Sequence, residues 1–148
     1  MTTYHLDANT EDDSGRSDPT TNDLPTARRG RPQIVSMQWA LGTLRVTPTG
    51  PAIGEREAFI IARNVHDAFN RYGLRMKNFV LDLRNVQTVS SLGLGVCVDL
   101  RHAAHAKGAK SILYFGADSP LRDLFRMMRV DQLFRVVARE SALPRMTP

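Results

Sequence analysis

The run from Phe79 to Val98, FVLDLRNVQTVSSLGLGVCV, constrains the fold more than any other part of the chain. It opens with an apolar stretch at 79–83 that is too short for a helix and is bounded by polar residues, which is typical of a buried strand. A mixed segment follows, and then two serines, Ser90 and Ser91, precede apolar residues that recur at helical spacing. Serine is a favoured N-cap because its hydroxyl accepts a hydrogen bond from an orphaned amide of the first turn. The run therefore predicts a strand, a short loop and a serine hydroxyl at the positive end of a helix.

Two glycines, Gly93 and Gly95, lie in the first turn and a half of this predicted helix. Glycine inside a helix costs about 1 kcal/mol relative to alanine. Such a cost indicates that another backbone, or a partner, comes close to the helix there. The sequence thus predicts a close approach at the serine end.

Along the rest of the chain the hydrophobic pattern alternates between strand and helix periods. Predicted strands span 34–40, 44–48, 79–83, 111–115 and 134–137, and predicted helices span 55–72, 91–107 and 120–128. Gly42 joins the first two strands in a tight turn, and helices separate the later strands, which predicts a mixed sheet with right-handed crossovers. We expect an α/β sandwich in which three to four helices pack on a four- to five-stranded sheet.

The two ends of the chain differ from this middle part, 34–140. Residues 1–33 are rich in Thr, Asp, Asn, Ser and Pro with almost no apolar periodicity, so we expect a disordered polar tail. Residues 141–148 are expected to be a frayed C-terminal tail. Within the polar tail, the run Arg28, Arg29, Gly30, Arg31, Pro32 resembles the core of an AT-hook, which inserts arginines into the minor groove of DNA. A lone copy in a basic chain is more often a solvated linker, so nucleic acid is not an expected partner.

The sequence offers little for catalysis or metal binding. Phosphate-binding, metalloprotease and nucleophile-elbow motifs are absent from it. His102 and His105 are three residues apart on a predicted helix, but no third ligand accompanies them. Cys97 is the only cysteine, which excludes an intramolecular disulfide and favours a cytoplasmic location. No apolar run is long enough to span a membrane. We expect a cytoplasmic protein with no enzymatic activity, no cofactor and no metal.

The segment VLDLRNVQTVSSLGLGV, with HAAHAKGAKSILYF after it, resembles the STAS domain of bacterial anti-sigma factor antagonists. In that family a strand is followed by D-S-S-G-L-G-V/L, and a partner kinase phosphorylates the first serine of this motif. An ungapped alignment places that serine on Ser91, and Gly93, Leu94 and Gly95 match the G-L-G. The stretch at 119–136 also fits the family's S-P-x-(V/L)-x-x-L-(F/L) pattern and final strand. The resemblance covers nearly all of the predicted domain and implies a STAS fold.

The chain departs from the family pattern at three positions in and near the serine motif, and Arg129 and Val130 occupy a later turn where glycine is commoner. Ser90 stands where the family has Asp, Leu92 replaces its second serine, and Ile53 stands nearest to an acid that the family carries after its second strand. Glu55 lies two residues further on, and whether it substitutes stays open. Because these acids are missing, two alternatives also stay open: Ser90 is the acceptor, or Ser91 does no more than cap its helix.

The resemblance implies an anti-sigma factor antagonist, with a serine-kinase anti-sigma factor of the small ATPase type as its partner. In this hypothesis the unmodified protein binds the kinase and thereby releases the sigma factor. Phosphorylation of Ser91, or alternatively of Ser90, abolishes binding. The alternative hypothesis is a diverged STAS interaction module or scaffold that phosphorylation does not regulate. The residues implied in partner binding are Thr88, Ser90, Ser91, Leu92, Gly93, Leu94 and Gly95.

Overall fold

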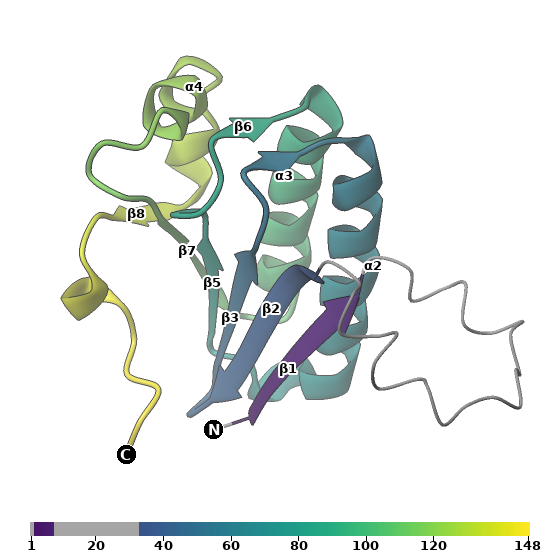
Figure 1. Ribbon diagram of the computed structural model, residues 1–148. Coiled ribbons are helices and arrows are strands. Elements are labelled where there is room, and N and C mark those ends of the chain that lie inside the picture. The colour runs from purple at the N-terminus through teal and green to yellow at the C-terminus, as the bar shows by residue number, and fades with distance from the viewer. Residues whose placement is uncertain (1, 8–32) are drawn as a thin grey trace, which may run out of the picture.

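In the computed structural model the described residues are 2–7 and 33–148, and they form a mixed sheet with two long helices on one face (Figure 1). The order of the strands in this sheet is β1-β2-β3-β5-β7-β8. Its strands are β1 Thr2–Asp7, β2 Gln33–Ala40, β3 Thr43–Pro48, β5 Asn78–Asp82, β7 Lys110–Tyr114 and β8 Arg135–Val137. A separate pair joins β4 Ala52–Ile53 to β6 Thr88–Val89. The helices are α2 Glu55–Tyr72, α3 Ser91–Ala106 and α4 Leu121–Met127, with short 3₁₀ turns η3 Gly73–Arg75, η4 Val130–Leu133 and η5 Glu140–Ala142.

The α/β fold expected from the sequence is confirmed, but the sheet has six strands where four to five were expected. The additional strand is β1, which runs antiparallel to β2 at the edge of the sheet. The expectation of a disordered tail over 1–33 is therefore wrong for Thr2–Asp7 and for Gln33. Tyr4 packs against the core and its hydroxyl lies 3.1 Å from that of Tyr72 in α2. A polar sequence can form an edge strand because the backbone supplies the pairing. The remainder of the predicted tail, 8–32, lies outside the described residues.

A two-residue turn joins β2 to β3, as Gly42 predicts. Leu41 and Gly42 both have positive φ, 51° and 78°, which is the requirement of a type I′ hairpin. The Gly42 carbonyl accepts hydrogen bonds from the backbone N–H groups of Lys77 at 2.7 Å and Asn78 at 3.1 Å. The hairpin turn is thus fixed to the segment that leads into β5.

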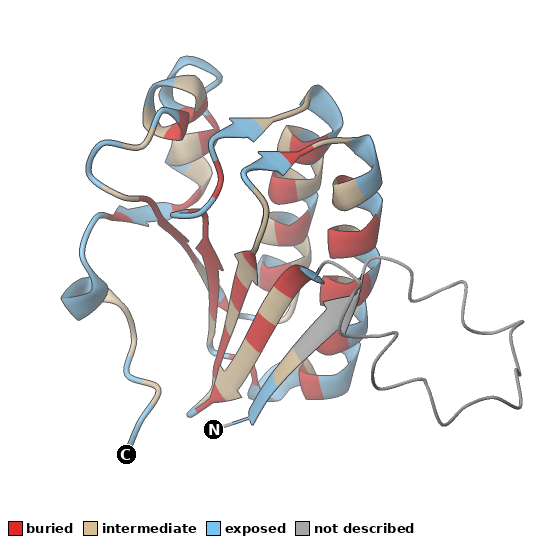
Figure 2. Ribbon diagram, in the orientation of Figure 1, coloured by how far each residue is buried: buried red, intermediate tan, exposed pale blue. Residues whose placement is uncertain are grey.

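The main core lies between the sheet and the pair of helices α2 and α3. β3, β5 and β7 are parallel, and α2 and α3 are the crossovers that connect them. The apolar stripe predicted for 55–72 is buried, and Phe69 of this stripe meets Phe79 of β5 edge to face with ring centroids 5.1 Å apart. Cys97 and Leu100 of α3 are buried as well. Figure 2 shows the buried residues gathered on the sheet and on the helix sides that face it.

The opposite face of the sheet carries a smaller core. Val80, Ile112, Tyr114 and Val137 form it, and Leu143 packs against them from the C-terminal segment. The expectation of a frayed tail over 141–148 is therefore wrong for residues 141–143. Residues 141 and 142 belong to η5, and Leu143 packs against the sheet.

Candidate functional site

Ser90 is the N-cap of α3 and its polar groups are engaged by the chain itself. Its backbone N–H donates to the Ile53 carbonyl at 2.9 Å, and its Oγ accepts a hydrogen bond from the Gly93 N–H at 3.0 Å. Its carbonyl accepts from the Leu94 N–H at 2.9 Å. The half-buried Ser90 therefore satisfies one of the orphaned amides at the start of the helix.

Ser91 occupies the first helical position of α3, and its side chain is exposed. Among the described residues none forms a hydrogen bond with its hydroxyl. The interpretation that Ser91 only caps its helix is wrong, because Ser90 is the cap. The first amides of a helix have no intrahelical acceptor and carry partial positive charge, so the Ser91 hydroxyl lies beside groups that can receive an anion.

The two glycines of the motif differ in their surroundings. A Cβ on Gly93 would lie 2.8 Å from Val89 Cγ1 and 2.9 Å from Ile53 Cγ2, so the predicted close approach is present here and comes from the β4–β6 pair. A Cβ on Gly95 would meet nothing within 4 Å. Gly93 is therefore required by packing within the chain, whereas Gly95 leaves a bare, exposed strip of helix surface.

The β4–β6 pair brings the starts of α2 and α3 together. Ile53 pairs with Val89 in parallel, and each strand leads directly into its helix (Figure 1). Ile53, which stands nearest to the family's acid, is buried. Gly54 caps α2, and its N–H donates to Glu57 Oε1 at 2.9 Å. Glu57 is thus engaged in a capping box, and Glu55 is the exposed carboxylate in the first turn of α2.

An exposed phenylalanine on α2 adjoins this junction. Phe59 is 66% exposed and lies in the second turn of α2. His66, seven residues further and so on the same stripe, has its Nε2 3.1 Å from Asp99 Oδ2 of α3. His66 thus bridges the two helices while remaining partly exposed. The stripe that carries Phe59 consequently borders α3.

These observations define an open surface at the serine end of the two helices, called here the docking face. Thr88 is exposed, and Leu92 is 37% exposed although it is apolar. Leu94 turns inward and packs against the core. The implied binding residues therefore fall into two sets. Ser90, Gly93 and Leu94 pack or bond within the chain and hold the helix start in place, and the others lie on the surface. The docking face consists of Phe59, Thr88, Ser91, Leu92 and Gly95.

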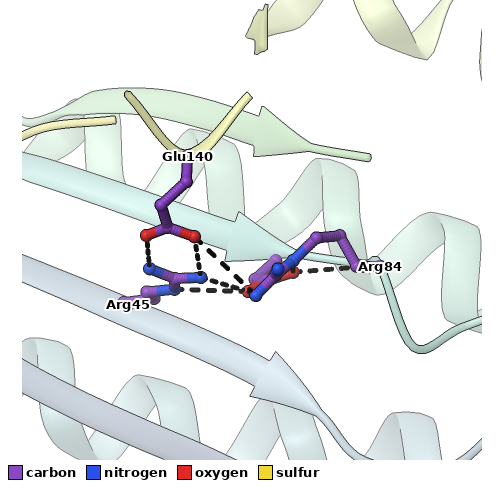
Figure 3. Close-up of polar contacts among 4 residues, drawn as sticks. Arg45, Arg84 and Glu140 are labelled. Carbon is purple, nitrogen blue, oxygen red and sulfur yellow. Dashed lines mark hydrogen bonds and ion pairs between the residues drawn. The ribbon is translucent and has the colours of Figure 1, made fainter. Parts of the chain in front are cut away.

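A network of charged side chains anchors the loop that leads to the serines (Figure 3). Asp82, at the end of β5, is 1% exposed and accepts hydrogen bonds from Arg45 of β3 and Arg84 of the loop, the shortest at 2.7 and 2.9 Å. The Arg84 backbone N–H donates to the same carboxylate at 3.1 Å. Glu140, in η5, accepts from Arg45 at 2.6 Å. The network joins the C-terminal segment, the sheet and Arg84 near the start of the loop.

Opposing effects set the pKa of the buried carboxylate. Burial raises the pKa of Asp82, but the hydrogen bonds from Arg84 and Arg45 outweigh it, and the net pKa is lowered from the ordinary 3.8. A hydrogen bond from Arg45 lowers the pKa of Glu140. The network was not predicted from the sequence. The indication for it was Asp82, a single acid inside an apolar strand, because buried acids are almost always paired.

Other predicted features lie away from the docking face. His102 and His105 are exposed, and within the described residues no group of three His, Cys, Asp or Glu side chains could hold a metal. Cys97 is a free, buried thiol, and burial raises its pKa to about 12. No described helix combines the length and the apolar character needed to cross a bilayer. The arginine run Arg29, Gly30, Arg31, Pro32 falls outside the described residues.

No model of a known protein family matches the chain, and no curated protein matches its sequence. Solved structures do match its fold. A proposed anti-sigma factor antagonist of Thermotoga maritima, TM1081, is 18% identical, with 71% of this chain and 86% of that chain covered and a TM-score of 0.62. An anti-sigma factor antagonist of Mycobacterium paratuberculosis is 14% identical, with coverages of 72% and 86% and a TM-score of 0.61.

The anti-sigma factor antagonist SpoIIAA of Bacillus, in its unphosphorylated form, is 14% identical, with 72% of this chain and 90% of that chain covered and a TM-score of 0.56. Its phosphorylated form matches with the same TM-score. The matches cover 71–72% of this chain, and they rest on its mixed sheet and the helices that pack on it. The chain therefore has the STAS fold, the fold of the anti-sigma factor antagonists.

Proposed function

We propose that this chain is a cytoplasmic, non-enzymatic anti-sigma factor antagonist that is switched by phosphorylation of Ser91. Its partner is a serine-kinase anti-sigma factor of the small ATPase type, and binding of that partner releases the sigma factor. The proposal rests on the different surroundings of the two serines. Ser90 Oγ is engaged in the helix cap, and the Ser91 side chain is exposed beside it.

The chain itself tolerates a phosphate at Ser91. The added group carries about −2 charge at neutral pH, and the start of α3 presents partial positive charge and unpaired amides. The side chain points to solvent, so no described side chain has to move to make room. Phosphorylation therefore leaves the fold intact and changes its surface.

A partner that packs against the docking face does not tolerate the same phosphate. Phe59 and Leu92 offer exposed apolar area, and Gly95 allows a partner backbone to approach the helix closely. A partner that covers this surface desolvates whatever stands on Ser91. Desolvating an unpaired charge costs several kcal/mol, which corresponds to a more than hundredfold loss of affinity.

Ser90 is a poorer acceptor than Ser91 for a structural reason. A phosphate on Ser90 would remove the hydrogen bond from the Gly93 N–H or force it to rearrange. It would also be placed beside the tight Gly93–Ile53 contact. Phosphorylation at Ser90 thus carries a folding cost that phosphorylation at Ser91 does not.

Phosphate mapping tests the proposed acceptor. The full chain is incubated with a serine-kinase anti-sigma factor and ATP, and the modified residue is located by mass spectrometry. We expect one phosphate, on Ser91, in the wild type and in Ser90→Ala, and none in Ser91→Ala. A phosphate that stays in Ser91→Ala and disappears in Ser90→Ala would assign the acceptor to Ser90 instead.

A second candidate is a STAS interaction module that phosphorylation does not regulate. It is favoured by the shortage of acids at the junction. Ile53 stands where the family carries an acid, and the Glu57 carboxylate is engaged in the cap of α2. Only Glu55 remains as an exposed acid in the first turn of α2. Absence of phosphate from both serines, together with partner binding through the docking face, would support this candidate over the first.

A further inference from the structure

The end of the molecule that lies opposite the serines is formed by short segments that contain five Lys and Arg residues and no acid. Residues 34–148 contain 16 Lys and Arg against nine acids. The serine end is mixed in charge: Glu55 is exposed there, but so are Arg56 and Arg84, and Asp82 is buried and paired with two arginines. At the other end α2 and α3 finish, β5 and β7 begin, and the β2–β3 hairpin turns (Figure 1).

Three segments make this end a continuous surface. The hairpin turn meets the segment before β5 where the Lys77 N–H donates to the Gly42 carbonyl at 2.7 Å. The segment before β5 meets the one before β7 where the Lys110 N–H donates to the Lys77 carbonyl at 3.0 Å. Segments 41–42, 71–77 and 107–110 contain no acid. Their cations and exposed leucines, called here the basic edge, are Leu41, Arg71, Leu74, Arg75, Lys77, Lys107 and Lys110.

Internal structure accounts for only part of this charge. Arg71 and Lys107 complement the C-terminal ends of α2 and α3. Arg75 donates to backbone carbonyls of its own turn. Lys77 and Lys110 are exposed at the starts of strands, and among the described residues no acid pairs with either. The stem of Lys77 lies against Gly42 of the hairpin turn, but the charges of both lysines are left without an acidic partner among the described residues.

Two leucines project from the same edge. Leu74, in η3, is 81% exposed, and Leu41, in the hairpin turn, is 58% exposed. Leu41 also holds a φ of 51°, a conformation that favours Asn or Gly and is unfavourable for leucine. An exposed apolar side chain at a strained turn is available for contact with a group outside the chain.

We propose that the basic edge binds an anionic phospholipid surface. Lysines and arginines at a protein surface are attracted to anionic lipid headgroups, and short aliphatic side chains between them enter the boundary below the headgroups. Projecting leucines favour a bilayer over nucleic acid, whose phosphate backbone offers an aliphatic side chain no apolar environment. The binding is peripheral and reversible.

The basic edge and the docking face can be occupied at the same time. α3 runs from Ser91 to its end at the basic edge over 16 residues, which corresponds to about 24 Å of helix. A chain held on a lipid surface by the basic edge would direct Ser91 and Leu92 away from that surface. The proposal does not depend on the partner or on phosphorylation.

Flotation of the full chain with lipid vesicles tests the proposal. The vesicles are phosphatidylcholine alone, or phosphatidylcholine with about 30% phosphatidylserine. We expect recovery with the anionic vesicles only, and loss of recovery at high salt because salt screens the charges. Lys77→Glu with Lys110→Glu should lower the bound fraction about tenfold or more, and Leu41→Ser with Leu74→Ser should lower it several-fold.

Matched controls lie outside the basic edge. Arg126→Glu with Arg129→Glu makes the same change in charge on exposed residues around the end of α4, and Met127→Ser removes an exposed apolar side chain there. Both should bind vesicles like the wild type. Equal losses in controls and edge variants, or no binding of the wild type to anionic vesicles, would overturn the proposal. So would displacement from vesicles by duplex DNA at lower phosphate concentration than by anionic lipid.

Discussion

Ser90 and Ser91 are neighbours in the chain with opposite surroundings: the Oγ of Ser90 accepts the Gly93 N–H at 3.0 Å, and the side chain of Ser91 is exposed. One hydroxyl stabilises the helix and the other is available to a kinase. This difference predicts that substitution of Ser90 changes the stability of the fold, whereas modification of Ser91 changes partner binding.

Removal of the cap hydroxyl should cost stability. Ser90→Ala leaves the Gly93 amide without its acceptor, so we expect about 1 kcal/mol less free energy of unfolding in urea. Ser91→Ala removes an exposed hydroxyl and should change that free energy by less than about 0.5 kcal/mol. A loss in Ser91→Ala as large as that in Ser90→Ala would contradict the assignment of the cap.

The two glycines of the motif should respond to alanine in opposite directions. Gly93→Ala places a Cβ 2.8–3.1 Å from Val89 and Ile53, so it should lower the melting temperature and disturb the β4–β6 junction. Gly95→Ala meets open space and should raise stability by up to about 1 kcal/mol, because alanine is the better helix former. Thermal unfolding followed by circular dichroism measures both. Two changes of the same sign would show that the local packing is different.

Phe59 should matter for partner binding and hardly for folding. Its ring is 66% exposed, so Phe59→Ser removes little buried area and should leave the free energy of unfolding within about 0.5 kcal/mol of the wild type. A central aromatic contact in an interface is worth about 2 kcal/mol or more, which predicts at least a tenfold loss of partner affinity. The control is Met127→Ser, which changes an apolar residue of α4 that is 75% exposed, and it should keep full affinity.

The charged network should make stability sensitive to acid. The pKa of Asp82 is lowered from 3.8 and that of Glu140 from 4.5, so the folded chain binds these protons more weakly than the unfolded chain does. The stabilisation is complete above about pH 5 and is lost as the pH falls through and below 4. Asp82→Asn should cost about 3 kcal/mol at pH 7 and flatten the profile below pH 5.

The control for this pH profile is Asp123→Asn. Asp123 is exposed and lies 3.7 Å from Arg126, a surface pair that contributes little. It should preserve the wild-type dependence on pH. A wild-type free energy of unfolding that stays constant from pH 6 to pH 3 would contradict the account of Asp82.

The sequence predicted much of this fold because the spacing of apolar residues and the residues that begin and end helices indicated the same elements. The helix at 55–72 carries a continuous apolar stripe and ends at Gly73, and its predicted bounds match those of α2. The serines, Gly93 and the strand before them were placed correctly for the same reason. The strand β1 was missed because its residues alternate weakly, and its pairing with β2 bridges a long separation in the chain.

The site was predicted only in part. A motif indicates which residues lie at a helix start, but it does not distinguish the cap from the residue after it, because that depends on whose Oγ reaches the Gly93 amide. Phe59 could not be assigned to the docking face, since its place beside α3 follows from packing between helices. Arg45, Asp82 and Glu140 are brought together by the sheet from three distant segments.

The most direct test compares one partner's affinity for two forms of the same chain. Wild-type protein phosphorylated on Ser91, verified by mass, and unmodified protein are each titrated with the anti-sigma partner in a calorimeter. The account predicts tight binding of the unmodified form and an affinity at least about a hundredfold lower for the phosphorylated form. Equal affinities for the two forms would contradict it.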